Sequence, residues 1–242
     1  MVDEGAESHS FSDGEGFDDP YEGFDLDPEF EIDPGQVDPV DSRVLTDNLD
    51  VNHLPKEQVD VEQLIEVAIE YIHINRHEQA TETFERAARL ADDDRLEQEA
   101  WVNKGAAHAE LEEYDAAIGA YQEALRIDDD SEHAASAETN LAYSLWEAGR
   151  SEQALEHAER AVELDPRFGQ AWYNRGFFLA ERGRAETAVE CFDNAQRLGM
   201  HTPELLEEKA RALEEIGEDE QAEEVAAEAE ELRQRAESRL ME

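Results

Sequence analysis

Few residues of this sequence have the type and spacing that catalysis or metal binding requires. His73 and His77 stand four residues apart, a spacing at which two imidazoles on one helix can share a metal ion. We expect a turn between two helices at Asn75, so the prediction is that the two histidines form no metal site. Cys191, the only cysteine, is more typical of a small packing residue than of a nucleophile. Without an HExxH motif, a glycine-rich phosphate loop or a nucleophile elbow, the sequence predicts a non-enzymatic protein with no cofactor.

The charge of the chain excludes further classes. Its 242 residues include 65 Asp and Glu against 20 Lys and Arg, a formal net charge of −45. Binding to nucleic acid or to an anionic membrane needs a basic surface, so we predict neither. Only three of the basic residues are lysines. This composition resembles that of haloarchaeal cytoplasmic proteins, in which molar salt shortens the Debye length to about 3 Å and screens the carboxylates. An ordinary acidic protein with disordered tails is the alternative.

Residues 1–52 differ in composition from the rest of the chain. They contain 17 acidic residues against a single basic one, Arg43, and four of the seven prolines. Such a segment buries too little apolar surface to offset its ordering entropy, so we predict a disordered acidic tail. Its aromatic residues leave open that it folds on a partner. The sequence has no stretch typical of a membrane span or a signal peptide, and we expect a cytoplasmic protein.

From about residue 61 the apolar residues follow a helical period, and the pattern repeats every 34 residues. The twentieth and twenty-seventh positions of five units are alanine, and the eighth is alanine or glycine. The units are 61–94, 98–131, 135–168, 169–202 and 203–236, with three-residue insertions at 95–97 and 132–134. Each unit is predicted to hold two helices and a turn, which contains Gly149, Gly183 or Gly217 in the last three. One helix pair cannot bury its apolar face alone, so residues 53–242 are predicted to form a stacked repeat domain ending in a short helical extension.

The stretch AWYNRGFFLAERGRAETAVECFDNAQRL, residues 171–198, resembles the tetratricopeptide repeat (TPR). The residues that carry the resemblance are Trp172, Gly176, Leu179, Ala188, Phe192 and Ala195. The resemblance covers residues 61–236 and implies an all-α, right-handed superhelix (solenoid) of about five helix-turn-helix repeats. One departure is a cation at the seventh position, usually leucine, of three units. These cations are Lys104, Arg175 and Lys209. We expect Lys104 and Arg175 to pair with local carboxylates while burying their stems; the alternative is that they meet an acidic ligand.

The same resemblance implies a concave groove, lined by the first helix of each unit, in which family members hold peptides. The sixth position is asparagine in three consecutive units, at Asn103, Asn140 and Asn174. An amide can hydrogen-bond an extended backbone of any sequence, although asparagine is also common at this position of the family consensus. Four aromatic residues occupy neighbouring groove positions and are candidate anchors for a ligand or packing residues between units: Tyr143, Trp146, Tyr173 and Phe177.

Three functional hypotheses remain. The leading one is a non-enzymatic adaptor that binds a peptide or helix of a cytoplasmic protein partner in the groove. A second is a self-associating assembly factor in which edge repeats stack between chains. A third is a regulatory module whose own tail, through its aromatics from Tyr21 to Phe30, occupies the groove. The repulsion between a tail and repeats that are both acidic weighs against the third hypothesis, unless molar salt screens it.

Overall fold

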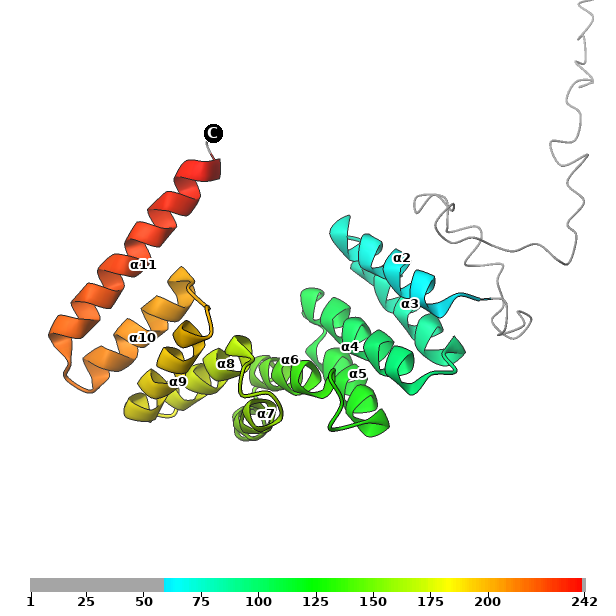
Figure 1. Ribbon diagram of the computed structural model, residues 1–242, viewed down its shortest axis with the longest axis horizontal. Helices are drawn as coiled ribbons and strands as arrows, with labels where there is room; N and C mark the ends of the chain where they lie inside the picture. Colours follow the sequence, from blue (N-terminus) through cyan, green and yellow to red (C-terminus); the bar gives the residue numbers. More distant parts are fainter. Residues whose placement is uncertain (1–58, 241–242) are drawn as a thin grey trace, which may run out of the picture. The chain divides into compact units, whose positions relative to one another are not determined.

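The computed structural model describes residues 59–240, which fold into ten α-helices and no strand (Figure 1). The predicted acidic tail lies outside these residues. The helices are α2 (Val61–His73), α3 (His77–Leu90), α4 (Asp94–Glu110), α5 (Tyr114–Ile127), α6 (Ala134–Glu147), α7 (Ser151–Leu164), α8 (Gly169–Ala180), α9 (Ala185–Arg197), α10 (Pro203–Glu215) and α11 (Asp219–Leu240).

The ten helices form five consecutive pairs, one in each predicted unit. We call the first helix of a unit helix A (α2, α4, α6, α8 and α10) and the second helix B. Each helix A contacts its own helix B, the helix B before it and the next helix A, whereas no comparable contact joins consecutive B helices within residues 59–240. Consecutive units therefore approach each other more closely on the helix A side. The predicted all-α solenoid of helix pairs is confirmed.

The turn between helix A and helix B uses a left-handed residue in all five units. The residue is the fifteenth of each unit: Asn75 (φ 56°), Glu112 (φ 59°), Gly149 (φ 76°), Gly183 (φ 71°) and Gly217 (φ 81°). Glycine adopts this conformation without steric cost, and asparagine tolerates it better than other residues with a Cβ. The sequence therefore signals the turn in four units, while Glu112 occupies it against its intrinsic preference.

Small residues lie where the helices of a unit cross. The alanines at the twentieth and twenty-seventh positions are at most 1 % exposed in every unit. A Cβ placed on Gly176 of α8 would lie 2.8 Å from the ring of Phe192 on α9, and a Cβ on Gly105 would likewise meet the ring of Tyr121. In these two units glycine lets a large aromatic ring lie directly against the backbone of helix A.

The first three-residue insertion lengthens a helix. Residues 95–97 belong to α4, which begins one turn earlier than the repeat alone would place it. Asp93 caps this helix, because its carboxylate accepts a hydrogen bond from the backbone nitrogen of Arg95 at 2.8 Å. The second insertion, by contrast, lies mostly in the loop before α6.

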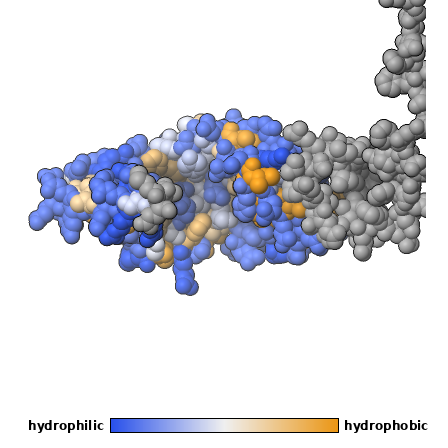
Figure 2. Space-filling model, turned by 90° about the horizontal axis from the view of Figure 1, so that it is seen from above, coloured by the Kyte–Doolittle hydropathy of each residue, from blue (hydrophilic) through white to orange (hydrophobic). Residues whose placement is uncertain are grey.

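Hydrophilic residues cover most of the surface, and on the face in Figure 2 the hydrophobic residues form small separate patches. Only three large hydrophobic side chains are classed as exposed among residues 59–240, namely Ile74, Tyr143 and Leu198. None of the helices described here combines the length and the apolar character that a bilayer span needs.

Candidate functional site

Two of the predicted aromatic residues, Trp146 of α6 and Phe177 of α8, form a group of contacting rings with Phe178. Trp146 of α6 is half-buried and stacks on Phe178 of α8, with ring centroids 5.1 Å apart, and it meets the ring of Phe177 edge-on at 5.4 Å. Phe177 is itself half-buried, whereas Phe178 is buried in the core. Trp146 and Phe177 therefore join two units and also keep part of their surface in contact with solvent.

Tyr143 is the most exposed of the predicted aromatic residues, with 45 % of its surface accessible. Its ring contacts none of the other three and lies edge-on to Tyr114, with centroids 6.5 Å apart. Burial raises the pKa of the Tyr143 hydroxyl above its ordinary value, and the carboxylates of Glu147 and Glu110 raise it further.

Tyr173 of α8 lies deeper than Tyr143. Its ring is 6.1 Å from that of Phe192, and it is half-buried. Burial raises the pKa of its hydroxyl, with smaller contributions from the carboxylates of Glu208 and Glu204. Its partial exposure leaves part of the ring in contact with solvent.

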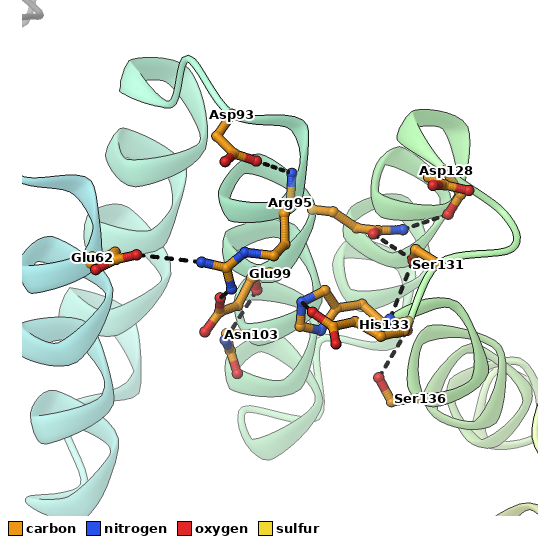
Figure 3. Close-up of polar contacts among 11 residues, drawn as sticks. Glu62, Asp93, Arg95, Glu99, Asn103, Asp128, Ser131, His133 and Ser136 are labelled. Atoms are coloured by element: carbon orange, nitrogen blue, oxygen red, sulfur yellow. Dashed lines mark hydrogen bonds and ion pairs between the residues drawn. The ribbon is translucent and has the colours of Figure 1, made fainter.

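The three asparagines do not share one environment. Asn174 is 5 % exposed, and both ends of its amide are used: its Nδ2 donates to the carbonyl of Thr139 at 3.2 Å, and its Oδ1 accepts from Gln170 at 2.9 Å. Asn174 thereby ties α8 to α6. Asn103 is half-buried and its Nδ2 donates to the carbonyl of Glu99 in its own helix at 3.0 Å (Figure 3). Asn140, which stands between the other two in the sequence, is half-buried.

The two histidines and the cysteine of the sequence analysis lie apart from these aromatic and amide residues. His73 ends α2 and His77 begins α3, so the two do not share a helix. Among residues 59–240, no three His, Cys, Asp or Glu side chains are arranged to hold a metal ion. Cys191 is 1 % exposed and lies in the main hydrophobic core, where burial raises the pKa of its thiol. The prediction of a packing role for Cys191 agrees with this position.

The three cations at the seventh position pair with carboxylates of the preceding unit, which agrees with the local pairing expected for Lys104 and Arg175. The pairs are Lys104 with Glu85 at 2.8 Å, Arg175 with Glu159 at 3.8 Å, and Lys209 with Asp193 at 2.6 Å. The carboxylate is the twenty-fifth residue of its unit each time. The unit that has Leu141 at the seventh position follows a unit with an uncharged Gln122 at the twenty-fifth. Cation and carboxylate therefore occur together at the contact between units.

These cations also lie against aromatic rings. The Nζ atom of Lys104 is 4.9 Å from the centroid of a Trp101 ring, and the guanidinium of Arg175 is 5.6 Å from Trp172. The hydrogen bond from Lys104 holds the pKa of the Glu85 carboxyl below its ordinary value. Each of these two cations is thus held by a carboxylate and a ring, a combination that stabilises a partly desolvated charge.

Gln98 of α4 makes a set of buried hydrogen bonds to the end of α5 and to the loop before α6, which the sequence did not predict. Gln98 is 1 % exposed; its Nε2 donates to the carbonyls of Ala124, at 3.0 Å, and Asp128, and its Oε1 accepts from Ser131 at 2.6 Å (Figure 3). It thereby satisfies carbonyls at the end of α5, where the helix leaves them without partners. An unbroken helical pattern across residue 98 hides this role in the sequence.

A second missed contact involves Glu138, which stands where other units have a large apolar residue. Its Oε2 lies 2.6 Å from Nδ1 of His157 on α7, and Glu138 is 6 % exposed. The sequence marks Glu138 as a departure from the repeat pattern, but the partner lies 19 residues away on the second helix. Only the pairing of the two helices reveals it.

Comparisons with known proteins agree with this fold. Tetratricopeptide repeat family models match residues 96–167 and 139–203. No curated protein matches the sequence. The fold is similar to MamA from Desulfovibrio magneticus RS-1, with 18 % identity over 72 % of this chain and 95 % of that one and a TM-score of 0.59. It is also similar to YrrB, a TPR protein with an unusual peptide-binding site, with 20 % identity over 79 % and 91 % and a TM-score of 0.55.

A further similar structure is TTC0263, a thermophilic TPR protein of Thermus thermophilus. The identity is 20 % over 76 % of this chain and 100 % of that one, with a TM-score of 0.57. At these identities the solved structures support the fold alone. Residues 96–203 therefore match the tetratricopeptide repeat family, and the helix pairs on both sides of them continue the same solenoid.

Proposed function

We propose that this protein is a non-enzymatic interaction module of the cytoplasm, and that it binds a peptide segment or helix of a partner protein on the helix A face of α6 and α8. The observation that carries the proposal is a run of uncharged helix A positions in a chain with a net charge of −45. Helix A residues at positions two, five, six, nine and twelve are all uncharged in these two helices. Seven of them are at least partly exposed, namely Ser136, Asn140, Tyr143 and Trp146 on α6 and Gln170, Tyr173 and Phe177 on α8, whereas Thr139, Asn174 and Ala180 are buried.

The same positions of α10, in the last unit, carry charged side chains instead. They are Glu204, Glu207, Glu208, Arg211 and Glu214. The change from these charged residues to aromatic and amide residues on α6 and α8 favours a contact surface there. Aromatic side chains suit such a surface because they supply a large contact area at a low cost in conformational entropy.

The roles of the predicted site residues follow from their placement. Tyr143, Trp146, Tyr173 and Phe177 are proposed to contact apolar side chains of the ligand, with Tyr143 making the largest contact. Asn140, together with the free Oδ1 of Asn103, is proposed to hydrogen-bond the ligand backbone. Asn174 is proposed to act by holding α8 against α6, since its amide already has two partners. The peptide-binding site of YrrB is an analogy that supports this mode of binding.

A selection experiment tests the proposal without knowing the partner. Peptides are selected from a random displayed library on the full-length protein in molar KCl and then titrated as fluorescent synthetic peptides. We expect Tyr143→Ala and Phe177→Ala each to weaken the selected peptides by about tenfold or more, the size of a moderate hot spot. The control variants Glu156→Ala and Glu186→Ala, exposed on α7 and α9, should leave the affinity unchanged.

Two results would count against the proposal. One is a selection that enriches no peptide. The other is a set of peptides whose affinity is the same for Tyr143→Ala as for the wild type. Analytical sedimentation of the same sample tests the self-association hypothesis. If the protein forms an oligomer that depends on its concentration, and Tyr143→Ala abolishes that oligomer, then the ligand of this face is a second copy of the chain.

A further inference from the structure

The first helix of the array, α2, lacks a neighbour that the other A helices have. Within residues 59–240 its main contacts are with α3 and α4, whereas α4, α6, α8 and α10 each also pack on the helix B of the preceding unit. On α4, Ala100 and Ala107 belong to the hydrophobic cluster of the first unit, and Lys104 pairs with Glu85 of that unit. The third, seventh and tenth positions therefore mark the flank of helix A that meets the preceding unit.

This flank is covered in the later units and open in the first. At the third and tenth positions of the other four A helices, every residue is at most 1 % exposed: Ala100, Ala107, Ala137, Ser144, Ala171, Phe178, Leu205 and Ala212. On α2 the same flank carries Gln63, Val67, Glu70 and, one turn further, Ile74. Gln63 and Val67 are half-buried, Glu70 is exposed, and Ile74 is 47 % exposed. The described residues therefore leave this flank of α2 uncovered.

Helix α2 is more apolar than a helix at the end of an array in water needs to be. Eight of its thirteen residues are apolar, and Leu64 and Val67, beside and on the open flank, keep part of their surface exposed. At the other end of the array, the exposed residues of α11 up to Arg239 are all charged, polar or alanine. A helix that is apolar on most sides is normally covered by other elements. Helix α2 therefore has the composition of an inner helix of the array.

The chain that leads into α2 changes composition shortly before it. Residues 44–54 read VLTDNLDVNHL and contain five valines and leucines, as many Val, Leu and Ile residues as the 43 residues before them. Six residues, 55–60, separate this segment from α2, and six residues, 128–133, likewise separate α5 from α6. The segment therefore has the apolar content, and its linker the length, to lie beside α2 as a helix B lies beside the next helix A.

We propose that residues 44–54 cover the open flank of α2 in the same chain, in place of the helix B that precedes every other helix A. The chain enters α2 at its N-cap, Asp60, so the segment starts at one end of the flank. A helix of thirteen residues is about 20 Å long, and eleven residues reach about 16 Å as a helix and more when extended. The valines and leucines of the segment then contact Leu64, Val67 and Ile74. The folded domain begins near residue 44, and the acidic tail is shorter than its composition alone predicts.

Charge favours this segment over other occupants of the flank. Residues 44–54 contain two acidic residues, whereas residues 1–43 contain fifteen. Helix α2 already exposes Glu62, Glu66 and Glu70, so residues 1–43 would bring like charges together. A second copy of the chain on the same flank would oppose the glutamates of two α2 helices.

A photo-cross-link within the full-length protein tests the contact directly. Benzoylphenylalanine replaces Ile74 or, as a control, Leu198, which is 40 % exposed in another unit. Each protein is irradiated at a KCl concentration at which circular dichroism shows it folded, then digested and analysed by mass spectrometry. We expect position 74 to form a link to residues 44–54 of the same chain, and position 198 to form none with that segment.

Hydrogen exchange shows whether the contact protects α2. We expect Leu49→Ser/Leu54→Ser to speed the exchange of the slowest α2 amides by about tenfold or more, because an uncovered terminal helix opens more often. The exchange of α10 should not change. The control variant Leu26→Ser/Phe30→Ser removes two apolar side chains from residues 1–43 and should leave the exchange of α2 as it is in the wild type.

Each other result would overturn the proposal. A link from position 74 to residues 1–43 would make the acidic tail the cover, and a link between two chains would make it a second copy. If position 74 forms no link and Leu49→Ser/Leu54→Ser leaves the exchange of α2 unchanged, the flank is solvated. None of these results bears on the peptide face of α6 and α8, which the selection experiment tests separately.

Discussion

Single residues of this protein are constrained by their backbone and their neighbours more than by their place in the repeat. The three asparagines share the sixth position, yet Asn174 bonds across to α6 while Asn103 bonds to its own helix. The repeat predicts which face of the helix carries the amide. It cannot predict which partner lies nearest, because that depends on how far the neighbouring helix A stands away.

Glu112 offers a test at the residue scale. A left-handed conformation costs a residue with a Cβ about 1–2 kcal/mol, and glycine avoids this cost while giving back about 0.5–1 kcal/mol in backbone entropy. We expect Glu112→Gly to raise the free energy of unfolding by about 0.5–1 kcal/mol, measured by denaturant titration. Glu112→Ala is the control: it removes the charge but keeps the Cβ, so it should stabilise much less. Equal effects of the two variants would assign the gain to charge and contradict the conformational argument.

Pairs of helices explain why the small residues recur. The same glycine-to-alanine change should have opposite signs at two helical positions. A Cβ on Gly176 would lie 2.8 Å from the Phe192 ring, so overpacking costing about 1–3 kcal/mol should exceed the helix propensity gain of about 1 kcal/mol. Gly119 is exposed within α5 and a Cβ there meets nothing within 4 Å, so Gly119→Ala should stabilise by about 1 kcal/mol.

Thermal and denaturant unfolding measure both changes. The double variant Gly176→Ala/Phe192→Leu should be less destabilised than the sum of its single variants, because the smaller side chain makes room for the added methyl group. Strict additivity, or a gain in stability from Gly176→Ala alone, would show that the glycine is not required by the helix crossing.

Most helices could be predicted from the sequence because the same pattern of apolar and small residues recurs in all five units. The beginning of α4 could not, since Asp92, Asp93 and Asp94 are all acceptable caps and only the packing of the first two units selects Asp93. The sequence predicted that cations at the seventh position pair with carboxylates, but it did not predict which carboxylates. Their carboxylates, such as Glu85 for Lys104, lie on the preceding helix B at a separation that depends on the stacking of units.

The whole molecule is governed by its charge. With a net charge of −45, mutual repulsion among carboxylates opposes folding unless salt screens it. We expect the helical circular dichroism signal to fall as KCl is lowered from molar concentration to about 0.1 M, where the Debye length reaches about 10 Å. NaCl at equal ionic strength should substitute for KCl if screening is the cause. Full helicity in dilute buffer would contradict the resemblance to haloarchaeal proteins.

Charge also explains why the candidate site could be only partly located from sequence. The aromatic residues stand out against an acidic chain, so Tyr143 and Trp146 were predictable as candidates. The different environments of the asparagines were not predictable, because Asn103 and Asn174 share one position of the repeat although only Asn174 is buried.

The most direct test of the binding face is a site-specific cross-link. A photoreactive benzoylphenylalanine is introduced at position 143 on α6 and, as a control, at position 156 on α7, and each protein is irradiated with a peptide from the selection. We expect a covalent adduct from position 143, detected by mass spectrometry and suppressed by excess unlabelled peptide, and none from position 156. Adducts from position 156 alone would place the ligand on helix B and contradict the central claim.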